Sequence, residues 1–489
     1  MKNFELKAQA VSSSLWALFE KFSIQIVQFI VTVVLTRLLD PKDFGLIVLA
    51  TIFLGISYAI ADGGFEKTLI QNQEILPIQI DTIFYLNALL GGILTLALYF
   101  ASPYISAFFN EPKLTSVLRY ISIGIFLNAL SQVQRTLLMK ELKFKKLSIG
   151  SIISYAGGGI VGITLAILGY GVWALVFSAL TGQFIFLLVF WIKSSWYPSL
   201  RFSFASIKSI LPYGLNILFS SILYFFVQQF SNFIIGKKFT GSDLGFVNRG
   251  SKTPEIVSNV LHSVLLKIAF PLFSKAQSDA ELFNKLLKKL VQTIAFVAFP
   301  LLFFLFINAT DVIVLLFTSK WLGSVIFLQI FCVVKMFDPF VALFHEVILA
   351  KGDAKLLSKS LILTSAIEII LILIGLSFGL RYIVAALAVS MAFQYFLYIF
   401  ILAKKVHINP ILPLKWVFPY LALSIIAALA CVLFDYFLGN ISLPTIITLS
   451  FKFILGVLIY VTGLFILKIN EASYFKLKDN GLLKLYFKI

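Results

Sequence analysis

Long apolar runs recur along this chain and leave little room for any other kind of structure. Each run holds roughly 20 mostly apolar residues, the length that an α-helix needs to cross about 30 Å of hydrocarbon. Helices satisfy their backbone hydrogen bonds within one segment, and the sequence lacks the alternating pattern of a membrane β-barrel. We therefore predict an all-α integral membrane protein of about fourteen spans, near residues 11–36, 44–61, 81–109, 115–138, 149–168, 172–192, 207–235, 254–273, 290–317, 323–350, 356–378, 382–403, 414–437 and 442–467.

The composition excludes most soluble classes. Only 13% of the 489 residues are charged and 60% are hydrophobic, whereas a soluble chain averages about 25% charged residues. The net charge of +18 indicates membrane topology and a lipid-facing surface rather than nucleic-acid binding, which would need a soluble basic domain. The first run is too long for a cleavable signal peptide and carries Glu20 and Lys21 near its middle, so we expect it to remain as a span.

The distribution of Lys and Arg predicts the orientation of the chain. Alternate loops and both termini hold most of the 40 basic residues, for example in KELKFKK (140–146), KLLKK (285–289) and the tail from Lys468 to Lys488. Such loops stay on the cytoplasmic side. We expect both termini to be cytoplasmic.

An internal repeat divides the chain. The segment TRLLDPKDFG (36–45) shares its layout with GKKFTGSDLG (236–245), and two further pairs follow at an offset near 200 to 211: QRTLLMKELKFKKLS (134–148) with HEVILAKGDAKLLSKS (345–360), and GYGVWALV (169–176) with GLRYIVAALAV (379–389). The repeat predicts two lobes of six spans each, residues 1–200 and 201–410. Because six is even, the two lobes have the same orientation. Residues 411–489 supply two additional spans and a basic cytoplasmic tail.

Polar side chains follow one face of four predicted spans that are related by the repeat. Spacings of three, four and seven residues place side chains on one helix face. Such a stripe can join helices by hydrogen bonds, but four related stripes favour an aqueous cavity between the lobes, near the midplane. The expected cavity-lining residues are Glu20, Gln25, Gln28, Tyr58, Asp62, Asn216, Ser220, Tyr224, Gln228 and Asn259.

Ionisable residues inside spans usually face a cavity or one another. Lys335 and Asp338 are three residues apart and are expected to form a local pair. Lys267 and Lys452 are expected to extend their ammonium groups to the lipid headgroups.

The remaining candidates predict packing rather than chemistry. Cys332 and Cys431 lie inside spans without metal-ligand spacing and are interpreted as small apolar fillers. The run GGGIVG (157–162) is expected to let two helices pack closely. We find no nucleophile arrangement, metal motif or cofactor motif, so we expect neither metal nor cofactor.

Basic groups slightly outnumber acids along the expected seam between the lobes, which favours an anionic ligand. A phosphate or diphosphate suits such a seam because Arg offers paired donors and Lys a mobile point charge. The expected diphosphate-binding residues are Arg249, Lys252, Lys21 and Lys267. Three carboxylates, Asp62, Glu255 and Glu368, are candidates for binding a coupling proton or sodium ion.

Five motifs in this order carry a family resemblance: RLLDPKDFG, DGGFEKTLIQ (62–71), VQRTLLMKELKF (133–144), GYGVWAL (169–175) and LGFVNRGSK (244–252). Together they resemble the polysaccharide exporters and flippases of the multidrug/oligosaccharidyl-lipid/polysaccharide superfamily. The resemblance covers nearly the whole chain and is weakest in the last two spans.

The resemblance implies fourteen helices, with two six-helix lobes in a V and alternating access. It implies a substrate of undecaprenyl-diphosphate-linked oligosaccharide moved across the bacterial inner membrane, with a polysaccharide polymerase or export machinery as a further candidate partner. The lipid II flippase, a more distant relative, similarly has a charged pair in its first helix, which Glu20 and Lys21 match. Arg249 matches an arginine near the start of the eighth helix.

Our sequence hypothesis is therefore a flippase rather than an enzyme, and three alternatives stay open. A cation or drug exporter of the same superfamily would favour acids and aromatics in the cavity. A membrane glycosyltransferase or polymerase acting on the same lipid would need large loops carrying acids. A passive scaffold would not need the repeated polar stripes.

Overall fold

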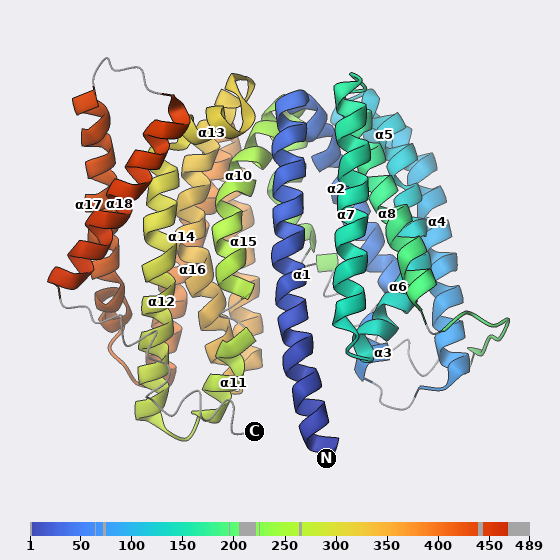
Figure 1. The fold of residues 1–489 in the computed structure, drawn as a ribbon, viewed down its shortest axis with the longest axis horizontal. Coiled ribbons are helices and arrows are strands. Elements are labelled where there is room, and N and C mark those ends of the chain that lie inside the picture. The colour runs from blue at the N-terminus through green and yellow to red at the C-terminus, as the bar shows by residue number, and fades with distance from the viewer. Residues whose placement is uncertain are drawn as a thin grey trace. The chain divides into compact units, whose positions relative to one another are not determined.

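The computed structural model describes residues 2–63, 65–71, 75–194, 196–204, 222–223, 225–263, 267–438 and 444–467. In this part of the chain all regular secondary structure is helical (Figure 1). The chain forms two compact units, Met1–Gly245 and Phe246–Ile489, and each is described by itself.

The first unit contains α1 (Lys2–Leu38), α2 (Pro41–Asp62), α3 (Phe65–Gln71), α4 (Pro77–Phe109), α5 (Lys113–Ile121), α6 (Ile123–Lys140), α7 (Phe144–Ile167) and α8 (Val172–Lys193). Residues 225–238 are also helical, and α10 (Gly241–Leu261) begins in the first unit and continues into the second. The second unit continues with α11 (Lys267–Lys275), α12 (Ala280–Ile307), α13 (Ala309–Phe317), the 3₁₀ helix η2 (Ser319–Ser324), α14 (Val325–Ala350), α15 (Ala354–Leu376), α16 (Leu380–Val406), α17 (Ile411–Leu438) and α18 (Thr445–Ile466).

Twelve helical segments among the described residues are long and apolar enough to cross a membrane. They correspond to twelve of the predicted spans and confirm the all-α membrane class. The other two predicted spans, 207–235 and 254–273, include residues outside the described ranges, so the count of fourteen stays a prediction. The boundaries predicted for the lobes, at 200 and 410, also stay predictions.

The repeated motif is a helix break followed by a new helix start. In the first copy, Pro41 opens α2, where a proline costs no hydrogen bond because the first N–H groups of a helix have no partner within it. In the second copy, the Thr240 hydroxyl accepts the backbone N–H of Asp243 at 3.2 Å, and the Asp243 carboxylate accepts the N–H of Thr240 at 3.1 Å. This reciprocal cap satisfies two donors at the start of α10.

Small residues set the packing of α7, which contacts both α1 and α8 (Figure 1). A Cβ atom on Gly158 would lie 2.5 Å from the carbonyl oxygen of Ser178 on α8, and one on Gly162 would lie 2.7 Å from the Ser178 Cβ. No side chain fits between these backbones. The prediction that GGGIVG packs helices closely is confirmed.

A buried carboxylate fastens the segment that follows α8. Asp81, near the start of α4, is 1% exposed and accepts both the backbone N–H and the hydroxyl of Ser199. Beside it, the hydroxyl of Thr82 accepts the N–H of Ser203 at 3.1 Å. These contacts hold residues 196–203 against the start of α4.

In the second unit, α14 packs against α12 and α16, and α15 packs on α16. The last two described helices also join this bundle: α17 contacts α12, and α18 contacts α17, α12 and α13.

The expectation that Lys452 extends to the lipid headgroups is wrong. Lys452 on α18 is 2% exposed, and its Nζ lies 3.1 Å from Asp311 Oδ2 on α13 and 2.6 Å from Asp435 Oδ1 on α17. Two carboxylates within reach stabilise the ammonium inside the unit, whereas a headgroup contact would require the side chain to leave the helix interface.

We predict that Lys452→Met lowers the thermal stability of the protein more than Lys415→Met, which removes an exposed cation from α17. Removing one partner of a buried ion pair costs about 3–5 kcal/mol; we expect about 2–4 kcal/mol here because both acids keep partial contact with the surroundings. Thermal unfolding in detergent measures the difference. Equal melting temperatures for the two variants would show that the ion triad does not stabilise the fold.

Candidate functional site

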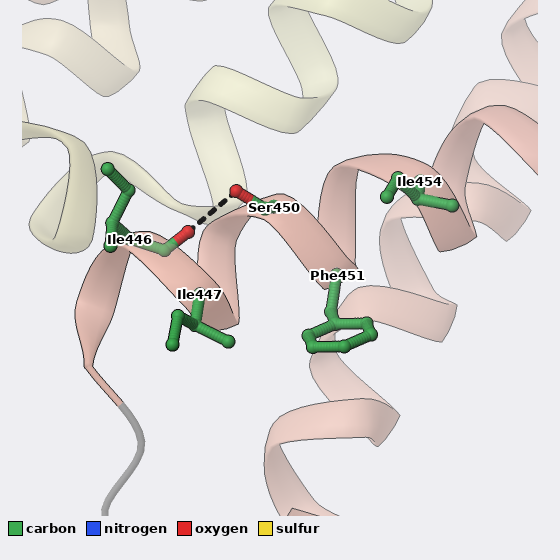
Figure 2. A pocket seen from close by; sticks show the side chains of 5 residues that line it. All are labelled: Ile446, Ile447, Ser450, Phe451 and Ile454. Atoms are coloured by element: carbon green, nitrogen blue, oxygen red, sulfur yellow. Dashed lines mark hydrogen bonds between the residues drawn. The ribbon is translucent and has the colours of Figure 1, made fainter.

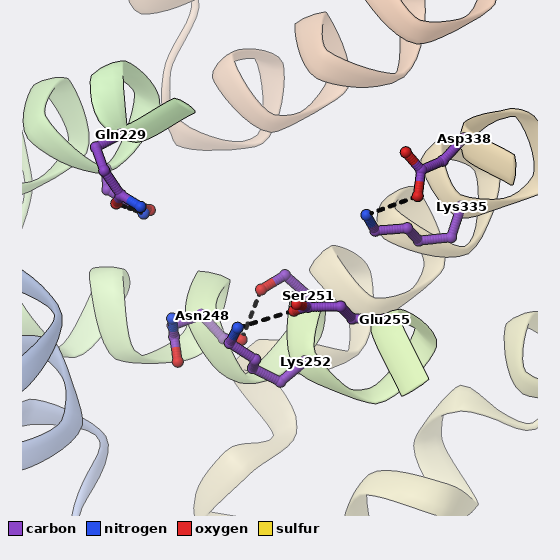
Figure 3. A network of polar contacts seen from close by, with 8 residues as sticks. Gln229, Asn248, Ser251, Lys252, Glu255, Lys335 and Asp338 are labelled. Carbon is purple, nitrogen blue, oxygen red and sulfur yellow. Dashed lines mark hydrogen bonds and ion pairs between the residues drawn. The ribbon is translucent and has the colours of Figure 1, made fainter. Parts of the chain in front are cut away.

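Four ionisable or polar side chains from α10 and α14 form one network inside the second unit. Asp338 accepts the Ser258 hydroxyl at 2.5 Å and the Lys335 ammonium at 3.1 Å. The Nε2 atom of His262 lies 3.6 Å from the same carboxylate oxygen. Figure 3 shows the contact between Lys335 and Asp338. We refer to Ser258, His262, Lys335 and Asp338 as the Asp338 network.

The Asp338 network lies where both helices depart from regular geometry. Pro339 follows the carboxylate inside α14, and a proline at this point leaves the carbonyl of Lys335 without its usual helical donor. Directly after α10, residues 262 and 263 form a π-helical turn, a feature frequent at functional sites. The network thus places an imidazole and an ammonium within 3.6 Å of one carboxylate oxygen at these two irregular points.

A second ion pair lies nearer the start of α10. Lys252 Nζ lies 2.9 Å from Glu255 Oε2, and the Lys252 side chain is 54% exposed (Figure 3). The pair is three residues apart, as expected for neighbours on one helix face. Two residues of the sequence hypothesis, a cation and an acid, are thus in direct contact, and Lys252 is the more exposed of them.

Arg249 occupies a different environment. It is 4% exposed, and its guanidinium lies 5.3 Å from the ring centre of Phe317 and 5.5 Å from that of Trp321. A planar cation over aromatic faces gains cation–π attraction. In this conformation Arg249 is therefore packed between α10 and the α13–η2 corner.

In the first unit, Glu20 and Lys21, which the sequence analysis treated as a pair, have side chains in different environments. Glu20 accepts the hydroxyl of Ser151 at 2.9 Å and that of Ser148 at 3.5 Å, both from α7. Lys21 is exposed. The carboxylate thus joins α1 to α7, while the ammonium points to another face of α1.

Asp62 lies where two of the family-like motifs meet. Its carboxylate accepts the side-chain amide of Gln132 on α6 and the backbone N–H of Glu66 on α3. One turn further, Glu66 Oε2 lies 3.9 Å from Arg135 of α6. The segments 62–71 and 133–144 are therefore partners, and Asp62 organises the short helix α3.

The other predicted residues lie as follows. Tyr58 accepts a hydrogen bond from Gln183 at 3.3 Å, and Glu368 accepts one from Ser390 at 3.4 Å. Gln25, Gln28 and Asn259 are half-buried, and Gln228 is exposed. Asn216, Ser220 and Tyr224 lie outside the described residues, as does the side chain of Lys267.

Two hollows differ in chemistry. One of about 270 Å³ is formed along α18 by Ile446, Ile447, Ser450, Phe451 and Ile454 (Figure 2). Its single hydroxyl, on Ser450, already donates to the carbonyl of Ile446, so the hollow suits hydrocarbon rather than sugar. The other, of about 260 Å³ in the first unit, is polar and is lined by Asp43, Lys113, Ser116 and residues 169–173.

The sequence hypothesis missed the Asp338 network as a unit. It predicted the Lys335–Asp338 pair, which the structure confirms. It did not join this pair to Ser258 and His262, although these two side chains are four residues apart on one face of the adjacent polar helix. The available signal was two polar stripes, and the missing information was that their helices are neighbours.

Two solved structures have a similar fold. The fold is similar to that of the lipid II flippase MurJ in an inward closed conformation, with a TM-score of 0.72 and 16% identity over 95% of this chain and 99% of that one. It is also similar to an inward-facing multidrug resistance MATE transporter of the MOP superfamily, with a TM-score of 0.64 and 14% identity over 78% of this chain and 94% of that one. The chain thus shares its fold with these two structures.

Residues 34–326 match the family model described as polysaccharide biosynthesis protein, and the chain belongs to this family. Three relatives are the lipopolysaccharide biosynthesis protein WzxC of Escherichia coli K12, the succinoglycan biosynthesis transport protein ExoT of Rhizobium meliloti and the teichuronic acid biosynthesis protein TuaB of Bacillus subtilis. The chain is 25%, 24% and 25% identical to them over 67%, 63% and 68% of its length. It spans 67%, 62% and 69% of theirs.

We predict that the Asp338 network has a role in transport that is separable from its role in stability. Asp338→Asn leaves the Lys335 charge without its acid and should lower stability by about 2–4 kcal/mol. The double variant Lys335→Met/Asp338→Asn removes both charges and should recover most of this loss. Export of polysaccharide should nevertheless stay low in the double variant.

Thermal unfolding in detergent and polymer yield in cells measure the two effects, with Glu346→Gln on the same helix as the control. Full export by a stable double variant would restrict the network to a structural role.

Proposed function

We propose that this protein is a flippase that moves undecaprenyl-diphosphate-linked oligosaccharide repeat units across the bacterial inner membrane. The repeat units are those from which O-antigen, capsule or exopolysaccharide is built. The proposal rests on two cations, Arg249 and Lys252, which lie one turn apart on α10. They occur in a chain of the polysaccharide biosynthesis family. A diphosphate is an anion that such a pair can bind.

The different surroundings of the two cations suggest separate roles in binding. Lys252 is accessible and is paired with Glu255, so an incoming diphosphate competes with a single carboxylate for its ammonium. Arg249 is enclosed by Phe317 and Trp321, and its planar guanidinium is available only when that corner opens. Lys252 therefore makes the first contact, and Arg249 adds paired donors once the substrate is bound.

Translocation in this proposal is alternating access by two six-helix lobes, residues 1–200 and 201–410. The diphosphate and the sugars occupy a polar cavity, and the polyprenyl chain stays in hydrocarbon, so that no charged group crosses the lipid core unaccompanied. Lys21, exposed on α1, supplies a further cation. Both termini face the cytoplasm, in accord with the distribution of Lys and Arg.

We predict that Lys252→Gln lowers the rate of translocation by about 10- to 100-fold. This factor corresponds to the loss of one hydrogen bond to a charged group, which contributes about 1.5–3 kcal/mol. Because Lys252 is exposed, the substitution should leave folding unchanged. The measurement is the sidedness of lipid-linked repeat units in cells, with a sugar-modifying probe that does not cross membranes. Arg201→Ala, which removes an exposed charge from residues 196–204, is the matched control.

Arg249→Ala should lower the rate of translocation at least as strongly as Lys252→Gln does. Arg249→Lys should keep only part of the wild-type rate, because lysine lacks the planar donors of arginine. Repeat units that accumulate on the cytoplasmic face support the flippase. Normal sidedness with missing polymer, in cells depleted of the protein, would instead indicate a polymerase or a scaffold. Unchanged sidedness for both Lys252→Gln and Arg249→Ala would remove α10 from the substrate site.

A further inference from the structure

A polar hollow of about 260 Å³ lies at one membrane end of the first unit, where three helices begin. Its walls come from the first turn of α2, the start of α5 and the turn that leads into α8. Two of the family-like motifs meet here, because RLLDPKDFG supplies Asp43 and GYGVWAL supplies residues 169–173. The three helix starts directly follow the ends of α1, α4 and α7, so the hollow lies near the level of the lipid headgroups.

Exposed aromatic side chains flank the hollow. Trp173 lines it, and the Trp173 ring meets the Tyr120 ring edge-on, with 5.1 Å between the ring centres. Tyr120 is 47% exposed, and Tyr170, which also lines the hollow, is 55% exposed. Tryptophan and tyrosine are enriched where a membrane meets water, because their rings combine an apolar body with a polar edge. The hollow is therefore placed beside the membrane–water interface.

The carboxylate of Asp43 is held in place by the backbone. It accepts hydrogen bonds from the N–H groups of Asp40 and of Val172, which is the first residue of α8. A Cβ atom on Gly171 would lie 3.7 Å from both carboxylate oxygens, and Gly171 has a φ of +56°, which other residues rarely adopt. An ionised carboxylate has about four acceptor positions, so the two backbone donors leave room for a further donor.

Lys113, at the start of α5, supplies the opposite charge. Among the residues that the structure describes, its ammonium forms no hydrogen bond or ion pair, and it acts on Asp43 only through charge attraction at longer range. Ser116 donates its hydroxyl to the carbonyl of Lys113 at 3.0 Å, and the Ser116 oxygen can still accept a hydrogen bond. Lys42, at the same membrane end, is by contrast paired with Glu111 at 3.3 Å. An acid and a base thus line one hollow without forming a direct pair.

We propose that this hollow binds the headgroup of a zwitterionic phospholipid that carries a phosphate and a primary ammonium group, as phosphatidylethanolamine does. The Lys113 ammonium binds the phosphate as a mobile point charge. The Asp43 carboxylate accepts a charge-assisted hydrogen bond from the ammonium group of the headgroup. The acyl chains stay in the bilayer beside Tyr120 and Trp173. The headgroup site consists of Asp43, Lys113, Ser116 and residues 169–173.

The two charges of the headgroup site select among phospholipids. An anionic headgroup, such as that of phosphatidylglycerol, offers no cation to Asp43, and the carboxylate repels its net charge. A choline headgroup is zwitterionic but has no N–H donor for the carboxylate. A bound lipid would join the starts of α2, α5 and α8 and should therefore stabilise the folded protein. The inference does not depend on the proposed function, because it requires only that the chain lies in a membrane.

The test is thermal unfolding of the purified protein in detergent, with added phosphatidylethanolamine, phosphatidylcholine or phosphatidylglycerol of identical acyl chains. At a saturating lipid concentration, phosphatidylethanolamine should raise the melting temperature by about 3–6 °C more than either of the other lipids does. Equal rises for the three lipids would overturn the proposal.

Two substitutions separate the roles of the charges. Lys113→Gln should require about tenfold more phosphatidylethanolamine for the same rise, since one hydrogen bond to a charged group is lost. Asp43→Asn should abolish the difference between phosphatidylethanolamine and phosphatidylcholine, because a neutral amide does not attract the ammonium group. Lys42→Gln removes a cation from the same membrane end and is the matched control, expected to behave as the wild type.

The lipids are compared within each variant, so a change in the stability of the lipid-free protein does not alter the result. Lys113 is exposed, and Lys113→Gln therefore tests the headgroup site even if Asp43→Asn does not fold. An unchanged response to phosphatidylethanolamine in Lys113→Gln would rule out the site.

Soluble phosphoethanolamine distinguishes a lipid from a free ligand of the same chemistry. At the same concentration it should leave the melting temperature unchanged, because without acyl chains it does not gather in the detergent around the helices. An equal rise with the soluble compound would assign the hollow to a free ligand and contradict the lipid proposal. None of these measurements involves transport, so failure of the flippase proposal would leave their outcome unaffected.

Discussion

Hydrocarbon offers no hydrogen bonds, and this constraint accounts for both the helices and the polar contacts between them. Every ionisable group placed within a span needs a partner from the protein or a route to water. Glu20 meets two serine hydroxyls of α7, Asp338 meets Ser258 and Lys335, and Lys452 meets two aspartates. Except for the Lys335–Asp338 pair within α14, these contacts join different helices, so the polar residues also specify which helices are neighbours.

The same contacts divide the polar residues by their capacity for function. Asp62 and Asp81 are occupied by backbone N–H groups and organise α3 and the segment after α8. Lys252 is exposed and bound by one carboxylate only, and it is therefore the cation most available to a ligand on the described part of α10. Burial and partner number, rather than charge alone, separate residues that build the fold from those that can meet a substrate.

Sequence periodicity was sufficient to predict the features that depend on a single helix or on a fixed residue spacing. The twelve apolar spans, the close packing at Gly158 and the Lys335–Asp338 pair all follow from residues near each other in the chain. The contacts of Asp338 with Ser258 and of Lys452 with Asp311 join residues 80 and 141 positions apart. No local pattern encodes such distances, and the snorkelling expected for Lys452 failed because a single helix does not reveal its neighbours.

The position of Lys452 in the chain has a consequence for biogenesis. Asp311 and Asp435 are synthesised before Lys452, and both acids remain partly exposed even in the folded unit. During insertion they can stay hydrated near the ends of α13 and α17 until α18 arrives. Since N-terminal parts of a chain generally fold first, α18 supplies this countercharge after both acids are in place. A chain truncated before α18 would leave Asp311 and Asp435 without it.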